Sequence, residues 1–321
     1  MPTTKKIIVD QESAGTRLDV FLSDKLEISR SQIQKMIDNK QIGVDGNTPK
    51  KYGEKLRDED IISIASANKK TSAQKMKKQA DEKGFPKPEI IAETPDYIIV
   101  NKPAGLLTHP TEANEKSSLA GWIVKKFPAI KKVGDDPMRP GIVHRLDKEA
   151  SGLLVIARTQ KMFNHLKEQF KNRTIDKEYI VLVHGRVDKD WDEINFPIGR
   201  SETADKMAAM PQTVRGQPTE SGKEAKTEFF VEKRFVNFTL LHVKIHTGRM
   251  HQIRTHMLAY NRPVVGDPLY FQKKQKRVWD EKCGRLFLHS AKLGFKNLVG
   301  DEVEYKSPMP DKLSNFLLLL R

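Results

Sequence analysis

Cysteine is almost absent from this chain, which has a single one, Cys283, among 321 residues. One thiol can form neither an internal disulfide nor a cysteine-based zinc site, and such scarcity is typical of cytosolic proteins. No apolar run approaches the ~20 residues that a membrane span requires, and residues 1–6 lead into no apolar signal segment. We therefore expect a cytoplasmic protein without membrane attachment, which argues against a secreted hydrolase.

Motifs for nucleotide cofactors and metals are also missing. No G-x-G-x-x-G follows an expected strand, and there is no phosphate-binding loop, so a methyltransferase or a dinucleotide enzyme has little support. The histidines at 246, 251 and 256 recur every five residues, whereas a helical zinc pair uses a spacing of four. The sequence therefore predicts neither a cofactor nor a metal.

Positive charge, by contrast, is abundant. Lysine and arginine number 57 against 42 acidic residues, which gives a net charge of +15 and an isoelectric point near 9.6. A surplus of this size attracts polyanions, with nucleic acid as the first candidate and an anionic membrane as the second.

The length predicts about two domains, and the pattern changes along the chain. Residues 1–66 form a small domain with apolar residues at helical spacing over 18–22 and 33–37. A short alternating strand and a hairpin turn at Asp45–Gly46 follow. Residues 67–87 hold seven lysines against two acidic residues, a net +5, and are typical of a flexible basic linker that could also contact phosphates.

Residues 88–321 form the larger domain, which is strand-rich without regular β-α-β alternation. This favours an α+β fold with a mixed, mainly antiparallel sheet. Thr159 is expected to cap a helix with an apolar face. The expected strands cover residues 97–100, 153–157, 178–183 and 238–245.

Two polar segments of the larger domain, 141–147 and 247–256, lie beside apolar strands, as the floor of a cleft would. Arg145 and Arg254 would favour the ionised form of Asp147, and a lone oriented carboxylate can act as a nucleophile or a base. A structural Asp–Arg ion pair is the alternative for Asp147. Tyr179, taken alone, would more often be a core or interface ring than a catalytic group.

Five motifs follow one another along the larger domain. They are Asn101–Leu106, His144–Asp147, Lys177–Tyr179, Thr247–His256 with Gly266-Asp267 and Tyr270, and Leu288–Ser290. In this order they resemble the RluA family of pseudouridine synthases, and the resemblance covers essentially residues 88–321. Residues 15–66, with Val44-Asp45-Gly46 in place of the usual Val-Asn-Gly, resemble the small RNA-binding domain named after small-subunit ribosomal protein four.

The resemblance implies a cofactor-free enzyme that isomerises uridine in structured RNA. Asp147 would attack ribose carbon 1′ or remove the 2′ hydrogen, with Arg254 as its partner. Tyr179 would lie against the uracil, and Arg145 would fill the gap left by a flipped nucleotide. The other expected substrate-binding residues are Lys102, His144, Arg249, His251, Gln252 and Ile253, and the expected RNA contacts of the small domain are Arg17, Ser29, Arg30 and Gln32.

The expected partner is RNA, and the appended small domain favours large-subunit ribosomal RNA over transfer RNA. The main rival is a non-catalytic RNA-binding or ribosome-assembly protein, for which the small domain alone would suffice. An RNA methyltransferase is a second rival that lacks its glycine-rich loop. We expect a monomer.

Overall fold

A computed structural model describes most of the chain, which divides into two compact units, Met1–Lys83 and Gly84–Arg321. Nearly all of the predicted linker lies outside the described residues, so its boundaries stay a prediction. The described residues are 4–26, 30–38, 41–49, 51–65, 86–110, 117–201, 206–210, 213–214, 217–218, 222–272 and 277–321.

The N-terminal unit packs two helices on a three-stranded antiparallel sheet of order β1-β3-β2. Leu18, Leu22 and Ile33 are fully buried, which confirms the predicted apolar faces. Asp45 and Gly46 both have positive φ and form the predicted hairpin turn. The elements are β1 (Thr4–Ile8), a 3₁₀ turn (Gln11–Ser13), α1 (Leu18–Leu26), α2 (Arg30–Asp38), β2 (Ile42–Val44) and β3 (Ile61–Ala65).

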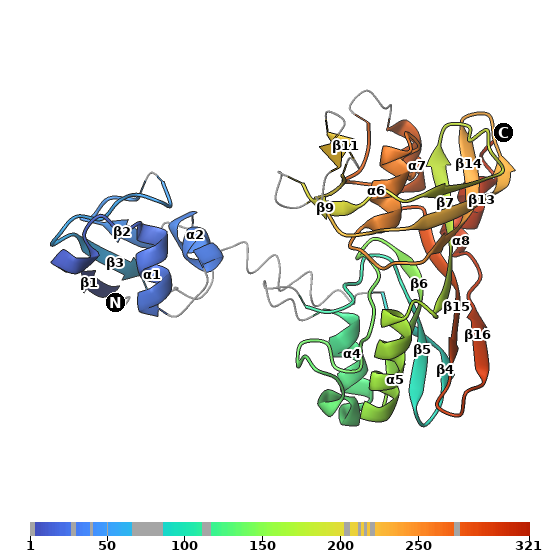
Figure 1. Cartoon of the computed structure of the whole chain (residues 1–321), viewed down its shortest axis with the longest axis horizontal. Coiled ribbons are helices and arrows are strands. Elements are labelled where there is room, and N and C mark those ends of the chain that lie inside the picture. Colours follow the sequence, from blue (N-terminus) through green and yellow to red (C-terminus); the bar gives the residue numbers. More distant parts are fainter. Residues whose placement is uncertain are drawn as a thin grey trace. The chain divides into compact units, whose positions relative to one another are not determined.

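The larger unit is built on a nine-stranded sheet of order β4-β5-β6-β15-β7-β14-β13-β8, with β16 also paired to β15 (Figure 1). Every pairing in it is antiparallel except that of β6 with β15. The predicted mixed, mainly antiparallel α+β fold is therefore confirmed. Its strands are β4 (Glu89–Glu93), β5 (Tyr97–Lys102), β6 (Ser151–Ala157), β7 (Asp176–His184), β8 (Trp191–Ile194), β13 (Thr227–Arg234), β14 (Phe238–Ile245), β15 (Leu288–Lys296) and β16 (Glu302–Lys306).

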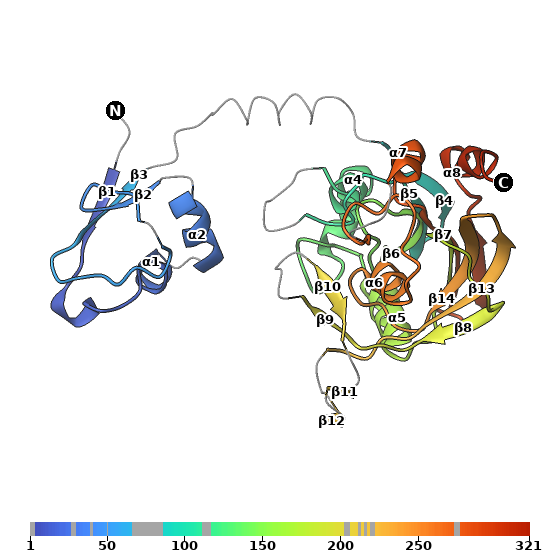
Figure 2. The same ribbon diagram turned by 90° about the horizontal axis from the view of Figure 1, so that it is seen from above.

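Helices cover both faces of this sheet. On β7, Val181 and Val183 pack into the main core with α4, α5 and α6, whereas Leu182 faces a second core with α7 and α8. In both views α8 lies beside β13 and β14 (Figures 1 and 2). The helices are α4 (Leu119–Lys126), a 3₁₀ turn (Pro128–Lys132), α5 (Gln160–Lys171), α6 (Gln252–Ala259), α7 (Val278–Cys283) and α8 (Asp311–Leu317), and small strand pairs join β9 (Ile198–Arg200) to β10 (Met207–Ala209) and β11 (Thr213–Val214) to β12 (Gln217–Pro218).

The expected strands and the helix cap of the larger unit are confirmed, with small extensions. The Oγ1 of Thr159 accepts a hydrogen bond from the backbone N–H of Met162 at 3.2 Å and caps α5. Gly152, with φ +118°, lies where β6 approaches β15, and a Cβ there would stand 2.3 Å from the carbonyl oxygen of Ser290. Among the described residues, no helix is long and apolar enough to span a bilayer.

Candidate active site

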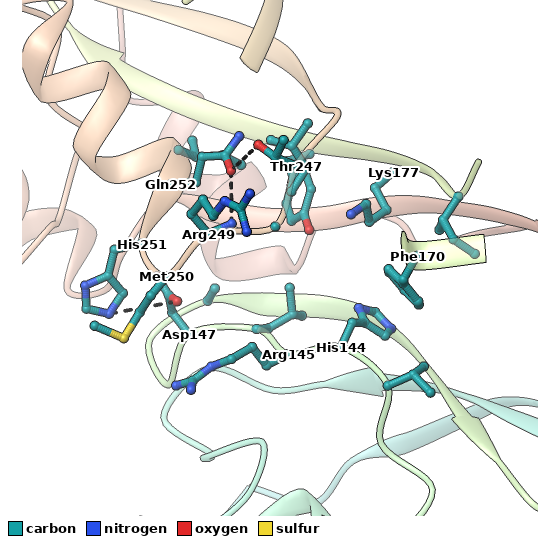
Figure 3. Close-up of a pocket in the computed structure, with 18 of the residues that line it drawn as sticks. His144, Arg145, Asp147, Phe170, Lys177, Thr247, Arg249, Met250, His251 and Gln252 are labelled. Carbon is teal, nitrogen blue, oxygen red and sulfur yellow. Dashed lines mark hydrogen bonds and ion pairs between the residues drawn. The ribbon is translucent and has the colours of Figure 1, made fainter. Parts of the chain in front are cut away.

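A cleft of 520 Å³ opens between β7, the segment before β6, and the segment that joins β14 to α6 (Figure 3). Of the described residues that line this cleft, Asp147 is the only acidic one. The lysines and arginines that line it are Arg139, Arg145, Lys171, Arg173, Lys177, Arg249 and Arg254. A single carboxylate therefore faces a cavity with an excess of positive charge, which suits a polyanionic ligand.

Asp147 meets Arg254 inside this cleft, as the sequence predicted. Nη1 of Arg254 donates a hydrogen bond to Oδ2 of Asp147 at 3.0 Å. The Arg254 side chain is fully buried, whereas 13% of the Asp147 side chain is exposed. The carboxylate is thus held from below by a buried cation, while part of it remains open to the cleft.

A second carboxylate holds that arginine. Asp267, also fully buried, accepts hydrogen bonds from Nε and Nη2 of Arg254 at 2.7 and 2.8 Å. Burial by itself would lower the pKa of Arg254, but its bonds with Asp267 and Asp147 outweigh burial and raise that pKa. The guanidinium therefore stays charged, with Asp267 fixing its plane and Asp147 at its free edge.

The backbone on both sides of Asp147 is held by Lys102, the last residue of β5, and by Thr108 in the segment after β5. Thr108 donates to the carbonyl of Leu146 at 2.7 Å and accepts from the Leu146 N–H at 3.2 Å. The ammonium of Lys102 is 2.7 Å from the carbonyl of Ala150 and also contacts the carbonyls of Pro103, Leu106 and Lys148.

The prediction that Lys102 binds substrate is wrong for this structure. The side chain is fully buried, and it does not belong to the cleft lining. Its amino group is engaged by backbone carbonyls, so no donor remains for a ligand. Lys102 instead supports the loop that carries Asp147.

Tyr179 and His251 line the same cleft as Asp147. Burial, and then the negative charge of Asp147, raise the pKa of Tyr179 above its usual value, so its phenol is protonated at neutral pH. Nε2 of His251 lies 3.9 Å from Oδ1 of Asp147, and its Nδ1 shares a 2.9 Å hydrogen bond with the hydroxyl of Tyr270. Burial lowers the pKa of His251, although Asp147 acts in the opposite direction.

His144 and Arg145 both line the cleft, but the His144 ring is fixed by its neighbours whereas the Arg145 side chain is exposed (Figure 3). The His144 ring stacks on Phe170 at 4.8 Å, and its Nε2 accepts the backbone N–H of Val155 at 3.1 Å. Burial lowers the pKa of His144 to about 3, so the ring is neutral and acts as a wall. Arg145 is exposed, and its side chain has no ion-pair partner among the described residues.

The segment before α6 is folded around the side chain of Gln252. Its Oε1 accepts from Thr247 and from the N–H of Arg249, and its Nε2 donates to the carbonyl of Lys226 and to Thr227. Gln252 thus shapes the loop, and no amide hydrogen is left for the substrate contact that the sequence predicted.

Two other predicted contacts of this segment do reach the cleft. Arg249 donates through Nε to the carbonyl of Glu224 at 2.9 Å and lines the cavity, as does Ile253, which is 4% exposed. His251, in a left-handed conformation with φ 55°, starts α6. The turn that this residue makes brings its imidazole toward Asp147.

In the N-terminal unit, Arg17 and Arg30 converge on Asp19, which is fully buried. Both oxygens of Asp19 accept bonds from Arg17 at 3.0 Å, and Arg30 reaches Oδ2 at 2.8 Å. The two arginine side chains are 51% and 52% exposed, so each keeps a face that can meet phosphates. Gln32 is exposed, and Ser29 lies outside the described residues.

Within the described residues, no group of three metal-ligating side chains gathers at one point. His256 is buried and hydrogen-bonded to Thr227 and to the carbonyl of Phe196. His246 lies 3.2 Å from Glu228. The three evenly spaced histidines therefore have separate surroundings.

Sequence reasoning missed Asp267 and Thr108 as parts of the site. Asp267 belongs to the late motif, but no role was predicted for it. Its place in that motif, directly after Gly266, is the feature that could have indicated a role in the site. Thr108 is separated from Leu146 by 38 positions, and no local pattern connects them.

Comparisons with known proteins identify both units. Residues 96–259 match the model of the RNA pseudouridylate synthase family, and residues 16–62 match the S4 domain. The fold and the matched core thus define an RNA pseudouridine synthase. The chain belongs to the RluA-type family of these enzymes and carries an N-terminal S4 domain.

Curated relatives align over almost the full chain. An uncharacterized RNA pseudouridine synthase of Bacillus subtilis is 32% identical over 317 residues, covering 98% of this chain and 97% of the relative. The ribosomal large subunit pseudouridine synthase D of Nitrosomonas europaea is 33% identical, covering 99% and 88%. The solved structure of human RNA pseudouridylate synthase domain containing 1 superimposes with a TM-score of 0.58 at 24% identity, covering 73% of this chain and 90% of that one, and supports the same fold.

Proposed function

We propose that this enzyme isomerises uridine in large-subunit ribosomal RNA and that Asp147 performs the chemistry at the ribose. The observation that carries the proposal is Asp147, the one carboxylate among the described residues that line this cationic cleft, which is partly exposed and 3.0 Å from a buried arginine. The cavity of 520 Å³ is of the size that holds a nucleotide.

Asp147 faces the cavity, and Arg254 supplies a permanent positive charge beneath it. It attacks carbon 1′ of the ribose or removes the 2′ hydrogen, and the N1–C1′ bond breaks. The protonated phenol of Tyr179 lies beside the base and orders the uracil; it takes up the carbon 5 proton, directly or through water, only as it passes its own proton on to water. The detached base rejoins the sugar through carbon 5.

The target base must leave its stack before it can enter this cleft, at a cost of a few kcal/mol. Arg145 is exposed at the cleft, and a guanidinium plane can stack in the gap that the flipped base leaves. Arg17 and Arg30 of the S4 domain contribute phosphate contacts that hold the RNA.

Release of tritium from RNA labelled at uridine carbon 5 tests the proposal. The wild-type protein should release tritium, and Asp147→Asn should release none while binding RNA nearly as well. Glu149→Gln is the matched control, because that carboxyl is in the same loop but 3.8 Å from Arg254. Normal turnover by Asp147→Asn would exclude the assigned role.

The substrate class is tested with two RNAs in the same assay. Transcripts of large-subunit ribosomal RNA should release tritium in preference to transfer RNA, and pseudouridines should be missing from that ribosomal RNA in cells without the gene. The names of relatives such as the Nitrosomonas europaea synthase D support this choice. Modification of transfer RNA alone would contradict it.

A further inference from the structure

Lys177 is a buried cation in the wall of the active-site cleft. Only 8% of the residue is exposed, yet it is among the cleft-lining residues. Among the described residues its ammonium has neither a hydrogen-bond nor an ion-pair partner, and the nearest interaction is with the ring of Phe170 at 5.2 Å. Figure 3 shows the amino group directed into the cleft.

Burial without a counter-charge is costly for an ammonium ion. Other buried cations of this unit are compensated: Arg254 has two carboxylates, and Lys102 has four carbonyls. Burial lowers the pKa of Lys177 to about 8, so most of the side chain is still charged at pH 7. An uncompensated cation that opens into an active site indicates a place where a ligand brings the missing negative charge.

The position of Lys177 selects the part of the substrate that it meets. Lys177 and Tyr179 are alternate residues of β7, so their side chains leave the same face of the sheet about 6.6 Å apart. That separation is comparable with the length of a pyrimidine base. In Figure 3 Lys177 lies next to Phe170, at the end of the cleft away from Asp147.

The surroundings of Lys177 favour a base over a phosphate. The ring of Phe170 lies 5.2 Å from the ammonium, and the apolar Ile175, two residues before Lys177, also lines the cleft. A phosphate keeps its hydration better at an exposed cation such as Lys171, whose side chain is 75% exposed. A flat base with a carbonyl oxygen fits a narrow apolar wall that carries one donor.

We propose that Lys177 is a further catalytic residue, whose ammonium binds a carbonyl oxygen of the target uracil and stabilises the negative charge of the detached base. This inference rests on the proposed function. When the N1–C1′ bond breaks, its electron pair stays with uracil and spreads over N1, O2 and O4. Asp147 meanwhile becomes neutral, as an ester on carbon 1′ or as the acid that has taken the 2′ proton.

Negative charge therefore moves from Asp147 to the base, on the side where Lys177 lies. Carbon 5 then bonds to carbon 1′, releasing the carboxylate or taking back the proton at carbon 2′. This bond returns the negative charge to Asp147 and leaves the base neutral. The carbon 5 proton then passes to water, and N1 takes up a proton from water. A preorganised cation that meets charge only in the reacting state lowers the barrier of the cleavage step.

Lys177→Met and Lys177→Gln in the full-length protein test this role. With excess enzyme, the single-turnover rate constant should fall by about 100-fold or more, as for the loss of an oxyanion donor, while the Kd for RNA stays within about threefold. Lys161→Met is the matched control, because this exposed lysine of α5 does not line the cleft, and it should leave both the single-turnover rate constant and the Kd for RNA unchanged. The melting temperature of Lys177→Met should equal or exceed that of the wild type, because the buried charge is gone.

A second substrate isolates the charge on the base. When the target is 5-fluorouridine, fluorine itself stabilises the base anion, so Lys177→Met should reduce the single-turnover rate constant by a smaller factor than with uridine. The reaction is followed by the loss of 5-fluorouridine from digests of the RNA. An equal deficit with both bases, a wild-type rate constant, or a loss confined to Kd and its salt dependence would each overturn the inference. If the wild type is active and Asp147→Asn is not, those results leave the proposed function standing; an inactive wild type refutes the proposed function itself.

Discussion

The division of labour between Asp267 and Asp147 yields a prediction in which stability and activity separate. Asp267 is fully buried and binds Arg254 through two bonds of 2.7 and 2.8 Å. It also accepts the backbone N–H groups of Leu269 and Tyr270. Asp147 makes one 3.0 Å bond to the same arginine and is partly exposed.

Asp267→Asn keeps the shape of the side chain but leaves a buried guanidinium without its main counter-charge. Breaking a buried ion pair from one side costs about 3–5 kcal/mol. For a unit of this size, each kcal/mol lowers Tm by about 2–4 °C, so we expect a fall of about 6–20 °C. In Asp147→Asn the amide oxygen can still accept from Arg254, so the loss should be about 1 kcal/mol or less.

Tryptophan fluorescence during urea unfolding measures the free energy of unfolding of the larger unit, which contains both carboxylates. The three tryptophans, Trp122, Trp191 and Trp279, all belong to residues 84–321. Both variants should lose tritium release, but only Asp267→Asn should lose stability strongly. Glu224→Gln, at an exposed pair with Arg173, should leave the midpoint unchanged. If Asp147→Asn destabilised the unit as much as Asp267→Asn, the two carboxylates would not have the distinct roles assigned here.

Three further predictions concern the frame of the site. Gly152→Ala should prevent accumulation of folded protein, because its Cβ would overlap the backbone of β15, whereas Gly300→Ala, with similar positive φ but open space, should fold; soluble yield and Tm compare them. His289 is buried and burial lowers its pKa to about 4, so the folded state binds fewer protons than the unfolded state between pH 6.5 and 4. The neutral His289 therefore contributes stability above pH 6.5, and about 1–2 kcal/mol of it is lost when the pH falls to 5. Urea unfolding of the wild type and of His289→Gln at pH 6.5 and pH 5 should show a smaller loss in the variant. Lys102→Met removes the donor to the carbonyls of Lys148 and Ala150, so single-turnover isomerisation should slow while the Kd for RNA is retained; an unchanged rate constant would show that the loop holds itself.

Local sequence was a good guide to the elements and to the residues that can carry chemistry. The alternation over 238–245 predicted β14 to the residue, and Thr159 was recognised as a cap from its place before an apolar face. Asp147 and Arg254 were paired correctly although 107 positions separate them. That pairing came from the resemblance between ordered motifs, because no local spacing connects two residues so far apart in the sequence.

Roles that depend on where a side chain points were predicted less well. Lys102 and Gln252 belong to motifs beside the cleft, and both were expected to touch substrate. In the fold, the ammonium of Lys102 and the amide of Gln252 donate their hydrogen bonds to backbone carbonyls and neighbouring side chains. The loops before β6 and α6 contain buried polar groups, and these need hydrogen-bond partners. No pattern in the sequence distinguishes a lysine that faces a cleft from one that supports its floor.

The sequence by itself determined the class of fold, the RNA-directed charge and the one carboxylate around which the chemistry is proposed. These follow from periodicity, composition and ordered motifs, which are properties of short stretches. Only the tertiary structure decided that Asp267 clamps Arg254, that Thr108 and Lys102 fix the Asp147 loop, and that Lys177 has no counter-charge in the described structure. Burial and hydrogen-bond partners are set by strands and loops brought together from distant positions, and those contacts decide which polar group is free to act.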